Sequence, residues 1–223
     1  MFSDGRLPYL RMRSVRDEGL AHRLQLGIKR AVDLVVCSIL LVLGLPFLAL
    51  IGFVFKLSSP GPMFFMQPRV GKDGQLFQLI KFRSMTSNPA PDATTWTREE
   101  EARITSVGKF LRDYGLDELP QVINIIKGDM SIIGPRPPLP TQVGAYTAEQ
   151  FKAFQMRPGV LSLAAVEGRR SIPMERRIAL HARYAETWSL WLDLWIFWRS
   201  LFIVLGRQNA TETASQDNKD ARA

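Results

Sequence analysis

The residues of this chain best suited to chemistry are two adjacent carboxylates, Asp117 and Glu118. They lie in the segment LDELP. The apolar residues of the following QVINIIKG predict a helix with Asp117 as its N-cap, Pro120 in its first turn and a stop at Gly128. The amides and the dipole at the start of a helix attract anions. Acidic residues are also frequent caps, so the pair taken alone favours a structural role over catalysis.

Basic residues in short, conformationally restricted segments shift the interpretation of the acidic pair from a structural role towards catalysis. The segments KFRSM, LRDYG, GPRPP and RPG supply five candidate phosphate ligands: Lys81, Arg83, Arg112, Arg136 and Arg157. Proline and glycine fix the neighbouring backbone, which suits a guanidinium that holds a phosphate at fixed geometry. A carboxylate beside such groups can attack phosphorus as a nucleophile, and its neighbour can hold a divalent cation. We therefore predict Asp117 and Glu118 as catalytic residues, with Glu118 as the ligand of a Mg²⁺ cofactor.

Composition limits the alternatives. The chain has 223 residues, and its 29 Lys and Arg against 21 Asp and Glu give a formal charge of +8, which favours an anionic partner. The single cysteine, Cys37, excludes an intramolecular disulfide framework and a cysteine-rich zinc site. The sequence has no Walker loop, dinucleotide-binding fingerprint or His-based zinc motif. Nucleic acid is not expected as a partner, because the basic residues of the soluble part are not interleaved with aromatic ones.

An apolar run of 22 residues, 34–55, contains no charged side chain. As a straight helix it would extend about 33 Å, close to the roughly 30 Å of a hydrocarbon core. Pro46, preceded by Gly44, predicts a sharp bend near its middle. We expect a helix, a break and a second helix that dip into one leaflet and return to the cytoplasmic face as a re-entrant hairpin. A kinked transmembrane helix or a signal anchor is the alternative.

A second membrane signal lies in residues 188–206. Four of the five tryptophans recur there at helical spacing: Trp188, Trp191, Trp195 and Trp198. Tryptophan prefers the headgroup boundary, so we expect an amphipathic helix along the interface. Asp193 and Arg199 disfavour a spanning helix, and the alternative is a helix packed on the soluble domain.

The chain is interpreted as a monotopic membrane protein with one small catalytic domain of the α-rich α+β class. We divide it into a basic N-terminal arm at 1–28, a membrane re-entrant helix at 29–57, a cytoplasmic catalytic domain at 58–206 and a disordered tail at 207–223. The catalytic domain includes the interfacial helix 188–206.

Within the catalytic domain, β-prone runs at 62–67 and 75–82 flank Asp73-Gly74, a turn signal that predicts a short β-hairpin. Residues 84–97 and the proline-dense GDMSIIGPRPPLP are expected to be loops. Helices are expected at 99–114, ended by Gly115, and at 172–187.

Together these segments resemble a known family, the small monotopic phosphoglycosyl transferases, also called the bacterial sugar transferase family. The resemblance covers about residues 29–204. It rests on five segments in the family's order and spacing: KRAVDL, KFRSM, RITSVGKFLR, LDELPQVINIIKGDMSIIGPRP and RPGV.

The resemblance implies a two-step transfer at the cytoplasmic face of the bacterial inner membrane. The carboxylate matching Asp117 would attack the β-phosphate of a UDP-sugar and release UMP, and undecaprenyl phosphate would then take the phospho-sugar from the enzyme. In the family, the position of Glu118 is associated with magnesium. Four further positions are associated with phosphate binding or substrate orientation: Lys81, Arg83, Arg136 and Arg157. The implied partners are the UDP-sugar, undecaprenyl phosphate and anionic lipids, and a homo-oligomer is left open.

The sequence departs from the family in two places. The membrane break is Leu45-Pro46 instead of Ser-Pro, so a serine hydroxyl is not available to satisfy a freed carbonyl at the bend. After RPG the chain reads VLSLAAVEGRR. Four residues there differ from the family and leave the sugar open: Ser162, Leu163, Ala165 and Glu167.

Two other functions are weighed. A membrane-bound phosphohydrolase would resolve an aspartyl intermediate with water, but water needs no apolar hairpin to reach the site. A non-enzymatic peripheral scaffold of a glycan-assembly complex would use the apolar segments and the basic arm only to bind anionic membrane. The scaffold predicts that Asp117→Asn keeps all function.

Overall fold

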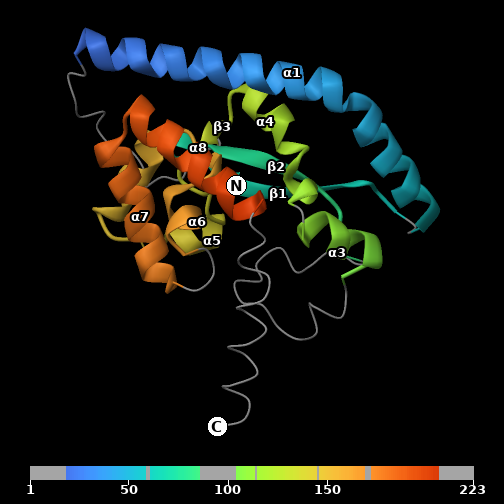
Figure 1. The fold of residues 1–223 in the computed structure, drawn as a ribbon. Helices are drawn as coiled ribbons and strands as arrows, with labels where there is room; N and C mark the ends of the chain where they lie inside the picture. The colour runs from blue at the N-terminus through green and yellow to red at the C-terminus, as the bar shows by residue number, and fades with distance from the viewer. Residues whose placement is uncertain are drawn as a thin grey trace.

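The computed structural model describes residues 19–58, 61–85, 104–113, 115–144, 146–168 and 172–205. A long helix, α1, lies across one side of a body that contains two short sheets and the remaining helices (Figure 1). The helix-rich character with short sheets confirms the expected α-rich α+β composition. Residues 1–18 of the basic arm expected at 1–28, most of the loop at 84–97 and the tail at 207–223 lie outside the described residues. The expected end of the arm is wrong, because residues 20–28 already belong to α1.

The helix α1 spans Leu20–Ser58 and carries Pro46 inside it. Its later part bends down toward α3, as a proline that removes one backbone hydrogen bond predicts (Figure 1). The expected break into two helices is therefore wrong, because one continuous helix runs through the bend. The re-entrant course of this segment through one leaflet stays a prediction. Within the described ranges, no helix combines the length and the apolar character needed to traverse a bilayer.

Polar side chains near the middle of α1 bind the body. Arg30 donates to the carbonyls of Ile125 and Ile126 at 2.7 and 3.1 Å, and Asp33 accepts from the amide of Ile132 at 3.1 Å. The opposite face is apolar and exposed, at a helical spacing: Leu20, Leu24, Ile28, Val32, Val35, Ile39, Val42 and Leu43. α1 thus turns these polar side chains, together with the buried Cys37 and Ile51, to the body and an apolar stripe away from it.

The predicted hairpin is confirmed. Strands β1 (Phe64–Val70) and β2 (Leu76–Phe82) pair antiparallel, with Val70 opposite Leu76 at the turn. Asp73 and Gly74 both have positive φ, 54° and 73°, as a tight hairpin turn requires. The first strand begins later and runs further than expected, because pairing continues through Pro68 to Val70.

The segment that carries the acidic pair differs from the expectation. Helix α3 begins at Ser106 and ends at Asp113, since Ile104 pairs with Met85 in an isolated bridge. Gly115 then turns the chain with φ 68°, so Leu116–Glu118 form a 3₁₀ turn, η3. Helix α4 spans Gln121–Lys127 with Pro120 at its N-cap position.

Asp117 as a helix N-cap is therefore wrong, because the left-handed glycine before it starts a separate turn. The stop at Gly128 is confirmed, with φ 98° and hydrogen bonds from its amide to the carbonyls of Asn124 and Ile125.

The proline-dense segment after Gly128 contains a strand that the sequence did not predict. β3 (Ser131–Ile133) pairs in parallel with β4 (Gly159–Leu161). The backbones of Gly134 and Gly159 approach so closely that a Cβ on either would overlap the other segment. Three residues are too few to give a periodic signal, which is why this strand resembled loop.

The remaining helices pack around these strands. They are α5 (Pro140–Val143), the 3₁₀ helix η4 (Gln150–Gln155), α6 (Leu163–Glu167), α7 (Met174–Thr187) and α8 (Leu190–Leu205). α7 confirms the predicted helix with a start two residues later. Trp188 is buried in a core cluster with Tyr184 and Ile196, whereas Trp191 is 76% exposed. The tryptophan run is thus part core and part surface.

Candidate active site

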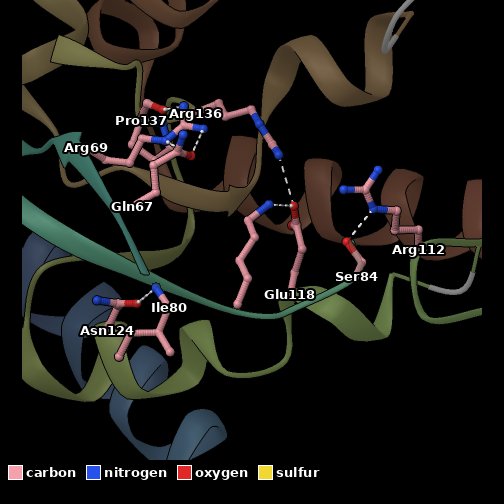
Figure 2. A network of polar contacts seen from close by, with 10 residues as sticks. Gln67, Arg69, Ile80, Ser84, Arg112, Glu118, Asn124, Arg136 and Pro137 are labelled. Carbon is pink, nitrogen blue, oxygen red and sulfur yellow. Dashed lines mark hydrogen bonds and ion pairs between the residues drawn. The ribbon is translucent and has the colours of Figure 1, made fainter. Parts of the chain in front are cut away.

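Glu118 is the centre of a cluster of charged side chains drawn from three separate segments. Its Oε1 accepts from Lys81 Nζ at 2.8 Å and from Arg136 Nη2 at 2.9 Å (Figure 2). Lys81 lies on β2, Glu118 in η3 and Arg136 in the loop after β3. Three of the residues predicted from the sequence are therefore brought together.

The cluster fixes the charge of each member. Burial opposes ionisation of Glu118, but the positive charges of Arg136 and Lys81 outweigh it and hold the pKa of this carboxyl well below its usual range. The Glu118 charge raises the pKa of Arg136 in turn. Burial lowers the pKa of Lys81, although Glu118 acts in the opposite direction. The result is a carboxylate that stays ionised between two cations.

Asp117 has a different environment, although it adjoins Glu118. Burial raises the pKa of its carboxyl, which Lys81 opposes and the charge of Glu118 reinforces. Arg112 and Arg136 also act on it as cations. A half-buried carboxylate beside several cations suits attack on an anionic phosphorus centre.

The other three predicted phosphate ligands are placed differently. Arg112 donates from Nε to Ser84 Oγ at 2.7 Å (Figure 2), and its charge acts on the Asp117 carboxyl. The Arg83 guanidinium packs against Gly61, where a Cβ would overlap its Nη1. Arg157 donates from Nε to the carbonyl of Gly128 at 3.0 Å. Arg83 and Arg157 are not brought to Glu118, and their part in phosphate binding stays a prediction.

Sequence reasoning missed two side chains that hold this site. Arg69 on β1 donates from Nη1 to the carbonyl of Pro137 at 3.0 Å, and from Nε and Nη2 to Gln67 Oε1 at 3.2 and 2.7 Å (Figure 2). Burial, followed by the charge of Arg136, lowers the pKa of Arg69 to about 10. Arg69 is preceded by a proline and followed two residues later by a glycine, a signal like that of GPRPP, but the hairpin turn accounted for those residues.

The second missed residue is Asn124 on α4. Its side-chain amide bonds the backbone of β2, with Oδ1 accepting from the Ile80 amide at 3.0 Å and Nδ2 donating to the Gln78 carbonyl at 2.7 Å. An asparagine in an apolar helical pattern gives no sequence signal for such a contact.

An apolar groove of about 560 Å³, a volume that includes its open mouth, lies between α1, the hairpin and α4. Leu119 and Pro120, which directly follow Glu118 in the chain, form part of its wall. The other lining residues are Leu41, Leu45, Leu48, Met63, Phe64, Phe82, Val122 and Ile123. Side chains alternate along a strand, so the groove lies on the Phe82 face of β2 and Lys81 projects from the opposite face. The lining contains no charged or polar residue, so the groove suits an aliphatic chain.

This site could bind a divalent cation only with substrate phosphates as additional ligands. The described residues contain no group of three His, Cys, Asp or Glu side chains, so a cage of protein ligands is absent from them. Lys81 and Arg136 both pair with Oε1 of Glu118. Oε2 and the Asp117 carboxylate are hard oxygen ligands, and Mg²⁺ needs only one or two of these together with substrate phosphates.

Comparison with known proteins gives a consistent result. The family model described as bacterial sugar transferase matches residues 24–207. A Caulobacter vibrioides UDP-glucose:undecaprenyl-phosphate glucose-1-phosphate transferase is 40% identical over 191 residues, which cover 82% of this chain and 71% of that protein. An Escherichia coli protein of the same name is 38% identical over 184 residues, 78% of this chain and 39% of that protein.

An Erwinia amylovora UDP-galactose-lipid carrier transferase is 34% identical over 199 residues, which cover 82% of this chain and 41% of that protein. The chain thus spans about two fifths of the length of the Escherichia and Erwinia relatives. The names of these relatives include two sugars, glucose and galactose, so similarity does not select one.

Proposed function

The chain belongs to the bacterial sugar transferase family, and from this premise we propose that it transfers a sugar phosphate from a UDP-sugar to undecaprenyl phosphate and releases UMP. Membership makes the chain a phosphoglycosyl transferase. The observation that carries the proposal is the ion cluster of Glu118, Lys81 and Arg136, whose charges also act on the adjacent Asp117 carboxyl.

In the first step the Asp117 carboxylate attacks the β-phosphorus of the UDP-sugar. A bond forms between a carboxylate oxygen and phosphorus, and the bond from that phosphorus to the oxygen bridging the two phosphates breaks. UMP leaves with the bridging oxygen and its electron pair, and the sugar phosphate stays on Asp117 as an acyl phosphate. The cations around Asp117, which are Lys81, Arg112 and Arg136, offset the charge that gathers on the phosphate oxygens.

In the second step an oxygen of undecaprenyl phosphate attacks the same phosphorus. The acyl phosphate bond breaks, the Asp117 carboxylate is restored, and the sugar is left on a polyprenyl diphosphate. The apolar groove supports a lipid acceptor, because its lining can take an aliphatic chain along Leu41 and Leu45. The donor needs no such groove, since a UDP-sugar is soluble in water.

Glu118 does not act as a second nucleophile in this proposal. Its charge is neutralised by Lys81 and Arg136, so its role is to orient these cations and to offer an oxygen to Mg²⁺. Glu118 Oε2 and the Asp117 carboxylate would hold the ion, which would neutralise diphosphate charge when bound.

We place the protein at the cytoplasmic face of the bacterial inner membrane. The exposed apolar stripe of α1 and the exposed aromatic side chains of α8 support this placement: Trp191, Trp195, Trp198 and Phe202. An excess of eight positive charges suits a surface of anionic lipid and both anionic substrates. Both termini are proposed to lie in the cytoplasm.

The test is nucleotide release by the purified chain with Mg²⁺, undecaprenyl phosphate and a panel of UDP-sugars. We expect UMP from the wild type with at least one sugar, and a phospho-sugar adduct on Asp117 when the acceptor is omitted. Asp117→Asn is the control, and it should release none while it unfolds at the wild-type temperature. Release of UDP would indicate glycosyl transfer without the phosphate. Near wild-type release by Asp117→Asn would refute the covalent step, and silence across the panel would favour the scaffold.

A further inference from the structure

The contact between β2 and α4 combines the apolar packing of Leu79 and Ile125 with one hydrogen-bonded polar side chain, that of Asn124. This residue is 1% exposed. Its Oδ1 accepts from the Ile80 amide (Figure 2). Its Nδ2 donates to the Gln78 carbonyl and also to Asp129 Oδ2, the latter at 3.2 Å. Both hydrogens and the oxygen of the carboxamide therefore have partners inside the protein.

The two backbone groups that Asn124 binds lie on one edge of β2. Gln78 and Ile80 are two residues apart, so their N–H and C=O groups point to the same side of the strand. The other edge of β2 pairs with β1. The carboxamide, with one donor and one acceptor, thus takes the place that the backbone of a third strand would occupy, and it fixes where α4 lies along β2.

This contact is close in sequence to both members of the Lys81–Glu118 ion pair. Lys81 directly follows Ile80 on β2. Glu118 precedes Asn124 by six residues, and the 3₁₀ turn η3 leads through two residues into α4. A shift of α4 along β2 would therefore move the Glu118 carboxylate relative to the Lys81 ammonium, which lies 2.8 Å away.

We propose that Asn124 is a positioning residue for the transfer reaction: it sets the register between α4 and β2 and thereby holds Glu118, and Asp117 beside it, against Lys81. It touches no reacting atom. The link to catalysis rests on the proposed function, whereas the register itself does not.

The test measures how strongly Lys81 and Glu118 are coupled in two backgrounds. Thermal unfolding of the full chain in detergent is followed for Lys81→Met, Glu118→Gln and the double variant, first in the wild type and then with Asn124→Ala. We expect the non-additive part of the temperature shifts to be clear in the wild type and to disappear with Asn124→Ala. If Asn124→Ala does not fold, Asn124→Asp is used, because it keeps the acceptor for Ile80 and loses the donor to Gln78.

The control background is Tyr184→Phe. Tyr184 is fully buried, and its hydroxyl donates to Asp193 Oδ1 at 2.6 Å and lies 3.3 Å from the Ile133 carbonyl, so this variant also loses buried hydrogen bonds. It should lower the unfolding temperature and leave the coupling intact. An equal loss of coupling in both backgrounds would reduce Asn124 to a general stabiliser, and unchanged coupling with Asn124→Ala would overturn the proposal.

A separate measurement addresses catalysis. Asn124→Ala should lower the kcat for UMP release by about 10²-fold, while Tyr184→Phe, destabilised by a similar amount, should change it by less than about threefold. If the wild type releases no UMP with any donor, the proposed function fails, but the unfolding measurement still decides whether Asn124 sets the ion pair.

Discussion

Lys29 on α1 and Asp193 on α8 form a buried ion pair, with Nζ 2.6 Å from Oδ2. The Tyr184 hydroxyl donates to Asp193 Oδ1 at 2.6 Å, and Trp188 Nε1 donates to Oδ2 at 3.1 Å. Lys29 also donates to the carbonyl of Ile133 at 2.9 Å. The Asp193 carboxylate thus joins α1 and α8, the two helices whose apolar faces are exposed. Its charge is paired with Lys29 inside the protein.

Lys29→Met should destabilise the fold strongly. The change leaves the Asp193 carboxylate buried without its cation, so the free energy of unfolding should fall by about 3–5 kcal/mol. Denaturant unfolding in detergent micelles measures this. The matched control is Lys152→Met, since Lys152 pairs with Glu186 at the surface and its loss should have little effect. Equal losses in the two variants would contradict a special role for the buried pair.

The pH dependence of UMP release should report Asp117. The nucleophile must be ionised, so the rate falls as pH drops through the pKa of Asp117. Because burial raises this pKa, the acid limb should lie at higher pH than the ordinary range of an aspartate. Arg112 lowers the pKa of Asp117, so Arg112→Gln should move the limb further up.

Single-turnover rates are measured across a range of pH with saturating UDP-sugar and no acceptor. They give the pH at which the rate falls on the acid side of the profile. Arg176→Gln is the control, because Arg176 is exposed on α7 and should leave the limb in place. An acid limb that is the same in wild type and Arg112→Gln would exclude Asp117 as the titrating group.

Local signals in the sequence were enough to find part of this site. The acidic pair and the Pro-flanked Arg136 could be recognised because each is marked by its own neighbours, and the hairpin by Asp73-Gly74. The predicted N-cap at Asp117 is wrong because Gly115, with its positive φ, starts a separate 3₁₀ turn. An acidic residue at the start of such a turn gives the same sequence signal as one at the start of a helix. Asn124 could not be found, because its partners belong to another element and only the packing of α4 on β2 brings them together.

Glu118 should stabilise the fold in a pH-dependent way. Its pKa is lower in the folded chain than in the unfolded chain, so its contribution is present above the unfolded pKa and is lost as pH falls through the folded pKa. Glu118→Gln should therefore unfold at lower temperature than wild type near neutral pH, and the difference should shrink as pH is lowered below the ordinary glutamate range. Scanning calorimetry from pH 3 to pH 8 measures this difference in unfolding temperature. These limits lie about one and a half pH units below and several units above the ordinary pKa of a glutamate. A constant difference across this range would show that the ion pairs do not carry the effect.

Arg69→Lys should damage the site although it keeps the charge. The guanidinium bonds two different groups at once, Gln67 Oε1 and the carbonyl of Pro137, and a single ammonium cannot reproduce this fork. The loss should release the loop that carries Arg136, which directly precedes Pro137. We expect a loss of about 1–3 kcal/mol in unfolding free energy and a kcat about 10²-fold lower.

The matched control for this prediction is the same exchange at an exposed position, Arg183→Lys on α7, which should leave both quantities unchanged. A double variant, Arg69→Lys with Arg136→Ala, shows whether Arg69 acts on kcat through Arg136 or independently of it. If Arg69 acts through Arg136, Arg69→Lys should add little to the defect of Arg136→Ala, because the second change removes the side chain that the first one misplaces. Fully additive defects would mean that the Arg69 guanidinium acts independently of Arg136, because its loss would then matter even without the Arg136 side chain.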